Sequence, residues 1–137
     1  MRKFKYKVTS KNGKSVVIHP KSPYCLDYNI GSTTYAQEGT HGIMVFKTLT
    51  NAMDWMNHWW QDMRVMRVIP SLGGFTPKVV SREIQTRHLH SFYKLMDRDN
   101  DDWKYYLSYN TAIPITGTMC YPSVYVHSEV DLEEEQL

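Results

Sequence analysis

The sequence IMVFKTLTNAMDWMNHWWQDMRVMRVI, which spans residues 43–69, decides the fold. It starts with an apolar run over 43–47 and ends with another over 65–69, and both runs are typical of buried strands. Between them, apolar side chains recur at the spacing of one helical face, and Thr48 stands where its hydroxyl can cap the first turn. We therefore predict a helix over 48–63 that lies across two neighbouring strands joined by a right-handed crossover.

The N-terminal residues predict a strand that carries an apolar face and a basic face. The apolar set is Phe4, Tyr6 and Val8, and the basic set that alternates with it is Lys3, Lys5 and Lys7. Such a period of two is typical of a half-buried strand. The sequence KNGK at 11–14 contains Asn-Gly and predicts a hairpin whose return strand spans 15–19. We expect a further short strand over 25–30.

The remaining sequence predicts more strands and a second helix. Glycine and proline mark a turn at 39–42 and a loop at 71–77. The other expected elements are strands over 78–81, 103–109 and 119–130, the last interrupted at Pro122, and a helix over 83–96.

These elements predict one compact α+β domain over residues 1–130. Its twisted, mostly antiparallel sheet would be covered on one face by the main helix, with the second helix nearby. The tail over 131–137 is acidic and short, and we expect it to fray.

With 137 residues, 42% of them apolar and 22% charged, the chain has the size and composition of a single globular domain. No apolar run approaches the roughly 18 residues that a membrane span needs, and no apolar segment typical of a secretion signal follows the basic N-terminus. Two cysteines, Cys25 and Cys120, are too few for a disulfide framework. We therefore expect a cytoplasmic protein that has no membrane partner.

Charge is distributed unevenly, although the formal net charge is only +2. Residues 1–26 carry seven basic side chains and no acidic one, whereas five acidic side chains and no lysine or arginine follow Lys104. The basic segment can attract phosphate or an acidic protein surface. Two other interpretations stay open: the two ends pair with each other, or the lysines protect a sheet edge from aggregation.

Motifs for metal binding and catalysis are incomplete. The stretch 97–102, DRDNDD, starts like a calcium loop but has Asp102 where glycine is needed and Ser108 where a glutamate closes the loop. His88 and His90 lie two residues apart, which on a helix directs them to different sides. We therefore predict no metal site, no cofactor and no catalytic residue.

Aromatic and methionine side chains are abundant and suit a binding surface. On the predicted helix Trp60 lies about 100° from Trp59, so we expect it at an interface, with packing at the edge of the core as the alternative. Tyrosines near basic side chains can stack on bases and hold phosphates, and the modest net charge suits a short nucleotide better than a duplex. The candidate contact residues are Lys5, Lys7, Trp60, Arg64, Arg67, Arg82, Arg87 and Tyr105.

The run GTHGIMVFKT at 39–48, followed by Ala52, Trp55 and MRVIP at 66–70, resembles small uncharacterised proteins encoded by bacteriophages and prophages. Those proteins open with a lysine-rich strand and hairpin, and then carry a tyrosine-plus-glycine stretch like YNIG in this chain. The resemblance covers residues 3–70. It implies a viral protein in the cytoplasm of an infected bacterial host.

The strand–helix–strand part is also similar to one half of an ADP-ribosyltransferase domain. Members of that family use an arginine or histidine early in the chain, a serine or tyrosine in the middle and usually a glutamate late. In this sequence Arg2 lies close to the terminus, the glutamates at 133–135 belong to the tail, and Glu129 is the one placed for a late strand. This resemblance implies an NAD-consuming transferase as the alternative function.

The favoured interpretation is a non-enzymatic, phage-type binding protein. It would bind a host protein or a small anionic ligand of nucleotide type, and so counteract a host immune system. A homo-oligomer with the ligand at a symmetric interface fits a domain that has little room for a deep pocket. A structural virion component is a third possibility.

Overall fold

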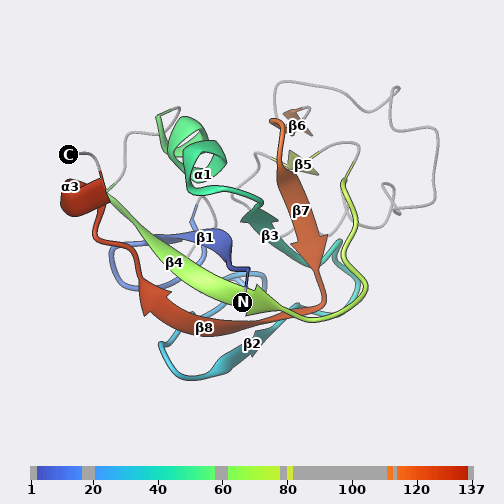
Figure 1. Cartoon of the computed structure of the whole chain (residues 1–137). Coiled ribbons are helices and arrows are strands. Elements are labelled where there is room, and N and C mark those ends of the chain that lie inside the picture. The colour runs from blue at the N-terminus through green and yellow to red at the C-terminus, as the bar shows by residue number, and fades with distance from the viewer. Residues whose placement is uncertain are drawn as a thin grey trace.

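The computed structural model describes residues 3–16, 21–57, 62–77, 80–81, 111–112 and 114–135. The elements are β1 (Lys5–Ser10), β2 (Thr33–Tyr35), β3 (Ile43–Phe46), α1 (Leu49–Met56), β4 (Met63–Pro70), β5 (Val80–Ser81), β6 (Thr111–Ala112), β7 (Thr118–Tyr121), β8 (Ser123–Glu129) and α3 (Leu132–Glu135). Six strands form one sheet in the order β2-β8-β4-β1-β3-β7, with antiparallel neighbours throughout, and β5 pairs with β6 separately. Figure 1 shows α1 on one side of this curved sheet. The predicted α+β class and antiparallel sheet are confirmed.

The predicted strand–helix–strand unit is present as β3, α1 and β4, but its two strands are not neighbours. β1 lies between them and pairs antiparallel with both. β3 and β4 therefore run parallel to each other with one strand between. The expectation of adjacent strands is wrong because β1, which lies far from residues 43–69 in the sequence, fills the place between them.

The main helix begins as predicted and ends earlier. Thr48 caps α1, and its Oγ1 accepts a hydrogen bond of 3.1 Å from the amide of Asn51. The predicted span 48–63 is too long, because Met63 is the first residue of β4 and pairs with β1. Backbone pairing with a distant strand outweighs the helical spacing of the Met63 side chain.

The turn after β1 is present, but the predicted hairpin is not. Gly13 has a φ of 76°, which favours glycine, and its amide donates a 3.0 Å hydrogen bond to the carbonyl oxygen of Ser10. Residues 15 and 16 of the return strand predicted over 15–19 form no strand, because the amide of Ser15 donates a 2.9 Å hydrogen bond to the carbonyl oxygen of Leu26 instead, and 17–19 lie outside the described residues. Lys14 instead forms an isolated bridge with Asp27, and the strand predicted over 25–30 is reduced to that bridge.

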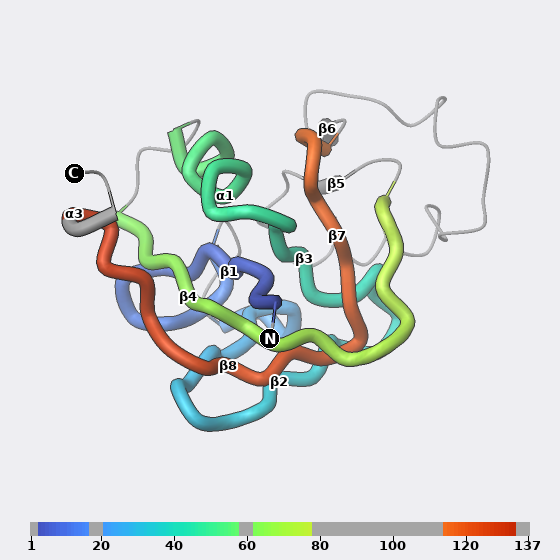
Figure 2. The backbone as a smooth tube through the Cα atoms, viewed as in Figure 1, coloured from blue at the N-terminus to red at the C-terminus, as the bar shows by residue number. Residues whose placement is uncertain are grey.

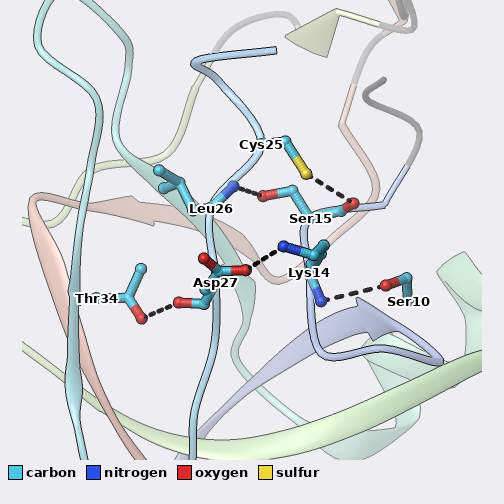
Figure 3. Close-up of polar contacts among 7 residues, drawn as sticks. All are labelled: Ser10, Lys14, Ser15, Cys25, Leu26, Asp27 and Thr34. Carbon is cyan, nitrogen blue, oxygen red and sulfur yellow. Dashed lines mark hydrogen bonds and ion pairs between the residues drawn. The ribbon is translucent and has the colours of Figure 1, made fainter. Parts of the chain in front are cut away.

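The segment 21–32, which precedes β2, lies on the side of the sheet away from α1, in light blue and cyan in Figure 2. Figure 3 shows how Asp27 anchors it: Lys14 Nζ lies 2.6 Å from Asp27 Oδ1, and Thr34 Oγ1 donates a 2.6 Å hydrogen bond to the Asp27 carbonyl oxygen. The ring of Tyr28, which follows the anchor, is buried against the sheet. This segment therefore closes one face of the sheet.

Apolar clusters lie on both faces of the sheet, because successive strand residues point to opposite sides. The inner cluster, on the face away from α1, consists of Tyr28, Ile43, Val45, Met66, Val68, Val124 and Val126. The helix-side cluster consists of Val8, Phe46, Ala52, Val65 and Val130. α1 packs on β1 and β3 and does not extend over β8 and β2, at the other end of the sheet.

The strand predicted over 119–130 with a break at Pro122 is confirmed as β7 and β8. The two strands belong to different parts of the sheet, since β7 pairs with β3 and β8 with β4 and β2. Gly42, in the predicted turn 39–42, permits the approach of β7. A Cβ atom at Gly42 would lie 2.7 Å from the carbonyl oxygen of Tyr121.

The acidic tail begins with the short helix α3. Leu132 packs against the helix-side cluster, and the amide of Glu133 donates a 3.1 Å hydrogen bond to Asp131 Oδ1. Residues 131–135, which we expected to fray, are thus attached to the domain by an apolar contact and a local hydrogen bond.

Several predicted elements lie outside the described residues. These are the second helix over 83–96, the strand over 103–109 and the first half of the strand over 78–81, whose second half is β5. No helix in the described ranges is long and apolar enough to cross a membrane.

Candidate functional site

Beyond α1, the helix-side face of the sheet carries solvent-accessible aromatic side chains. The aromatic face, as we call this surface, consists of Phe4, Tyr35, Tyr125 and His127, with Arg67 and Ile69 on β4 between them. Its side chains come from β8, β2, β4 and the residue that precedes β1, so residues distant in the sequence meet there.

Strand alternation places these side chains on one face. Val124 and Val126 belong to the inner cluster, so Tyr125 between them points to the helix side. On β2, the side chain of Thr34 is buried and bonds to Asp27, which lies on the inner face of the sheet. Tyr35, the next residue, therefore points to the helix side, as Tyr125 does. The register between β2 and β8 sets Tyr35 diagonally across from Tyr125.

The aromatic rings are unusually accessible for their size. Tyr35 is 71% exposed and Tyr125 is 39% exposed. The rings of Phe4 and His127 lie 4.7 Å apart between centroids and are tilted by 44°. Since β4 separates β1 from β8, these two side chains meet over β4. The result is an open surface of rings rather than a closed pocket.

A β-bulge shapes the end of this surface. Arg67 pairs with Ser128 and Val68 with Val126, so His127 is an extra residue without a partner on β4. Nη1 of Arg67 donates hydrogen bonds to Ser128 Oγ at 3.3 Å and to the carbonyl oxygen of Glu129 at 3.0 Å. The bulge therefore brings a guanidinium and an imidazole to one border of the aromatic face.

Lys7, which we predicted on a basic binding face, lies inside the protein. Its side chain is 7% exposed, and Nζ donates a 2.9 Å hydrogen bond to the carbonyl oxygen of Met44. Nζ also lies 5.1 Å from the centroid of the Tyr28 ring. Burial lowers the pKa of Lys7 from 10.5 to about 8, while the electrostatic influence of Cys120 raises it. Lys7 is a structural cation here, not a surface contact.

Two other predicted contact residues lie apart from the aromatic face. Lys5 is half-buried and pairs with Val68, whose side chain belongs to the inner cluster. Arg64 forms an ion pair with Glu129 through its Nε atom, and it lies an odd number of residues from Arg67 along β4. Arg64 and Arg67 therefore point to opposite faces and do not form one site.

The remaining predicted contact residues, Trp60, Arg82, Arg87 and Tyr105, lie outside the described residues, as do His88 and His90. Glu129, the late glutamate of the transferase resemblance, is the last residue of β8. Within the ranges given above, no group of three or more acidic, histidine or cysteine side chains could hold a metal ion.

Burial disfavours the thiolate form of both cysteines. Burial raises the pKa of Cys120 to about 12, with a smaller opposing effect from Lys7. Burial also raises the pKa of Cys25, and the charge of Lys14 opposes this. Since the thiolate is the reactive form, burial lowers the reactivity of both thiols, and most strongly that of Cys120.

The fold and the aromatic face define a small α+β protein with an open, ring-covered end of its sheet. The chain matches no protein-family model, no curated protein and no solved structure. The function must therefore be inferred from the residues of the site itself.

From the sequence we expected tyrosines to stack on bases, but we did not single out Tyr35, Phe4 or His127 as members of one surface. The local signal was the alternation of valine with ring-bearing residues in VYVH at 124–127. Nothing in the sequence showed that β2 would lie beside that strand on one side, or that β4 and the start of β1 would lie on its other side.

Proposed function

We propose that this protein is a non-enzymatic binding protein that holds a small anionic ligand of nucleotide type on its aromatic face. The observation that carries the proposal is the exposure of Tyr35 and Tyr125, which lie diagonally across β2 and β8, on the same open face of the sheet as Arg67. In the phage context that the sequence resembles, sequestering a nucleotide signal would counteract a host immune system.

The chemistry of the aromatic face supports a base and a phosphate together. Aromatic rings on a sheet surface stack on bases at about 1–3 kcal/mol per base, without needing a deep pocket. Guanidinium groups hold phosphate through paired hydrogen bonds. Arg67 lies at the border of the rings, so a base over Tyr125 would leave its phosphate toward β4.

Among the described residues several basic side chains are buried or already paired, which favours a short ligand over a nucleic-acid duplex. Lys7 is buried, Arg64 is paired with Glu129, and Lys14 is paired with Asp27. The positive charge next to the rings is therefore local, which suits a mononucleotide or a dinucleotide.

The test is calorimetric titration of the full chain with AMP, GMP, CMP and cyclic dinucleotides. Adenosine and ribose 5-phosphate serve as probes that lack the phosphate or the base. We expect at least one complete nucleotide to bind, and the two partial probes to bind at least tenfold more weakly. Failure of every nucleotide to bind below about 1 mM would overturn the proposal.

Matched variants separate stacking from general apolar contact. Tyr125→Phe keeps the ring, and Tyr125→Leu keeps only an apolar side chain. We expect Tyr125→Phe to bind within about threefold of the unchanged chain and Tyr125→Leu to bind about tenfold more weakly, since stacking contributes on the order of 1–3 kcal/mol. Equal binding by both variants would contradict a stacking site. Release of nicotinamide from NAD by the unchanged chain would instead support the transferase alternative.

A further inference from the structure

The edge of the sheet at β2 is open. β2 and β7 are the two end strands of the sheet. The free side of β7 is covered, because Phe75 exchanges two backbone hydrogen bonds with Cys120, at 3.1 and 2.9 Å. In the described part of the chain no strand covers the free side of β2, and Figure 1 shows β2 at the lower border of the sheet.

The backbone groups on this free side can be assigned from the hydrogen bonds to β8. The Ser32 carbonyl oxygen accepts a 3.0 Å bond from β8, and the Ala36 amide donates a 2.8 Å bond to the residue that precedes β8. Antiparallel bonding alternates along a strand, so the residues between these positions that bond outward are Thr33 and Tyr35. Their N–H and C=O groups have no hydrogen-bond partner among the described residues.

The side chains around the edge do not prevent pairing. Natural sheets protect open edges with lysine, proline or a bulge, and residues 28–37 contain no charged residue and no proline. The large apolar residues Ile30 and Tyr35 are 56% and 71% exposed next to the edge. Within the described ranges the protective feature is the short length of β2, which predicts weak rather than absent pairing.

We propose that two copies of this chain associate by antiparallel pairing of their β2 strands, with Thr33 of one copy opposite Tyr35 of the other. This register is symmetric about a twofold rotation axis at Thr34, as a symmetric dimer requires. Each Thr33–Tyr35 pair exchanges two hydrogen bonds, so the four free groups of each copy are all used. No like charges meet, because the edge is uncharged.

The pairing also has a geometric consequence. Tyr35 points to the helix-side face, so the aromatic faces of the two copies become continuous across the twofold axis. Dimer formation depends on the backbone of β2 and not on ligand binding. A protein that dimerises but binds no nucleotide can therefore be distinguished from one that binds a nucleotide as a monomer.

The test is the mass in solution by sedimentation velocity, from about 10 μM to 1 mM, since an interface built on three-residue strands is expected to be weak. We expect the mass to rise from one 16.1 kDa chain toward two. Thr33→Pro removes the outward N–H and adds a ring at the edge, whereas Thr33→Val keeps the N–H. We expect Thr33→Val to dimerise like the unchanged chain and Thr33→Pro to stay monomeric, with unchanged circular dichroism.

A charge pair tests the register if the proline variant fails to fold. One chain carries Thr33→Lys and Tyr35→Lys, and the other carries Thr33→Glu and Tyr35→Glu. Each alone should be monomeric, and an equimolar mixture should form a heterodimer, because the register sets unlike charges opposite each other. A single-chain mass for the unchanged protein at 1 mM would overturn the proposal, and so would equal dimerisation of both doubly charged chains.

Discussion

The Nζ atom of Lys7 donates a hydrogen bond to the carbonyl oxygen of Met44 inside the protein, at the point where β1 and β3 stop pairing. The single pair between these strands is Tyr6 with Phe46, and a continued ladder would set Val8 opposite Met44. Cys120, opposite Met44 on β7, bonds to Phe75 instead, so the Met44 carbonyl faces β1. A lysine side chain thus supplies the donor that the backbone of β1 does not.

Lys7 makes stability depend on pH in the alkaline range. Burial lowers its pKa from 10.5 to about 8, so the folded state binds this proton less tightly than the unfolded state. The cost of the buried charge is present below pH 8 and is lost as pH rises from about 8 to 10.5, so the free energy of unfolding should rise there. The full effect is about 3 kcal/mol, as an order of magnitude.

The measurement is urea unfolding of the unchanged chain and of Lys7→Met at pH 7.5, 8.5 and 9.5. The informative quantity is the difference between the two proteins, because it isolates the contribution of residue 7. We expect that difference to move in favour of the unchanged chain as pH rises. Lys47→Met removes an exposed lysine and serves as the control. A difference that stays constant with pH would contradict the buried ammonium.

Replacing Gly42 with alanine should destabilise the fold more than replacing Gly39. Both glycines have positive φ values, 110° and 85°, so both variants are strained. At Gly42 the new Cβ would also lie 2.7 Å from the Tyr121 backbone, whereas nothing lies within 4 Å at Gly39. We expect a loss of about 1 kcal/mol for Gly39→Ala and at least about 2 kcal/mol for Gly42→Ala. Chemical denaturation of both variants tests this, and equal losses would count against the close approach of β7.

The cap of α1 can be tested at Thr48. Thr48→Ala removes the oxygen that accepts the hydrogen bond from Asn51, and the loss should be about 1 kcal/mol. Thr48→Ser keeps the oxygen and should lose less than half of that. Thermal unfolding, followed by circular dichroism, measures both. If Thr48→Ser lowered the stability as much as Thr48→Ala does, the methyl group and not the capping oxygen would account for the loss.

The ion pair between Arg64 and Glu129 should contribute little. Both side chains are partly exposed, at 33% and 42%, and exposed pairs contribute about 0–1 kcal/mol. We expect Glu129→Gln to change the free energy of unfolding by less than about 1 kcal/mol, and to leave nucleotide binding on the other face unchanged. The readouts are urea unfolding and calorimetry. A large loss of any NAD turnover in this variant would point to the transferase alternative instead.

Much of the secondary structure was predictable because it depends on local spacing and turn chemistry. The apolar runs at 43–47 and 65–69, the Thr48 cap and the break at Pro122 all appear where the sequence places them. The errors have one cause. The hairpin after β1 and the long helix were both local interpretations, and both gave way to backbone hydrogen bonds with segments more distant in the sequence.

The candidate site was less predictable than the fold. The alternation of Lys5 and Lys7 with apolar residues suggests one basic and one apolar face, yet Lys7 is buried because the segment 21–32, with Tyr28, covers the face it points to. The aromatic face could not be read from the sequence, since Tyr35 and Tyr125 are 90 residues apart and become neighbours only through the pairing of β2 with β8.

By itself the sequence determined the strands near 5–10, 43–47, 65–69 and 119–130, the start of the helix and the turn after β1, because these depend on the period of apolar side chains and on residues such as Thr48, Pro122 and Gly13. Only the tertiary structure decided that β1 lies between β3 and β4, that Lys7 is a buried cation and that four rings share an open surface. Those features depend on which strands pair, and pairing is a choice among distant segments that local spacing does not encode.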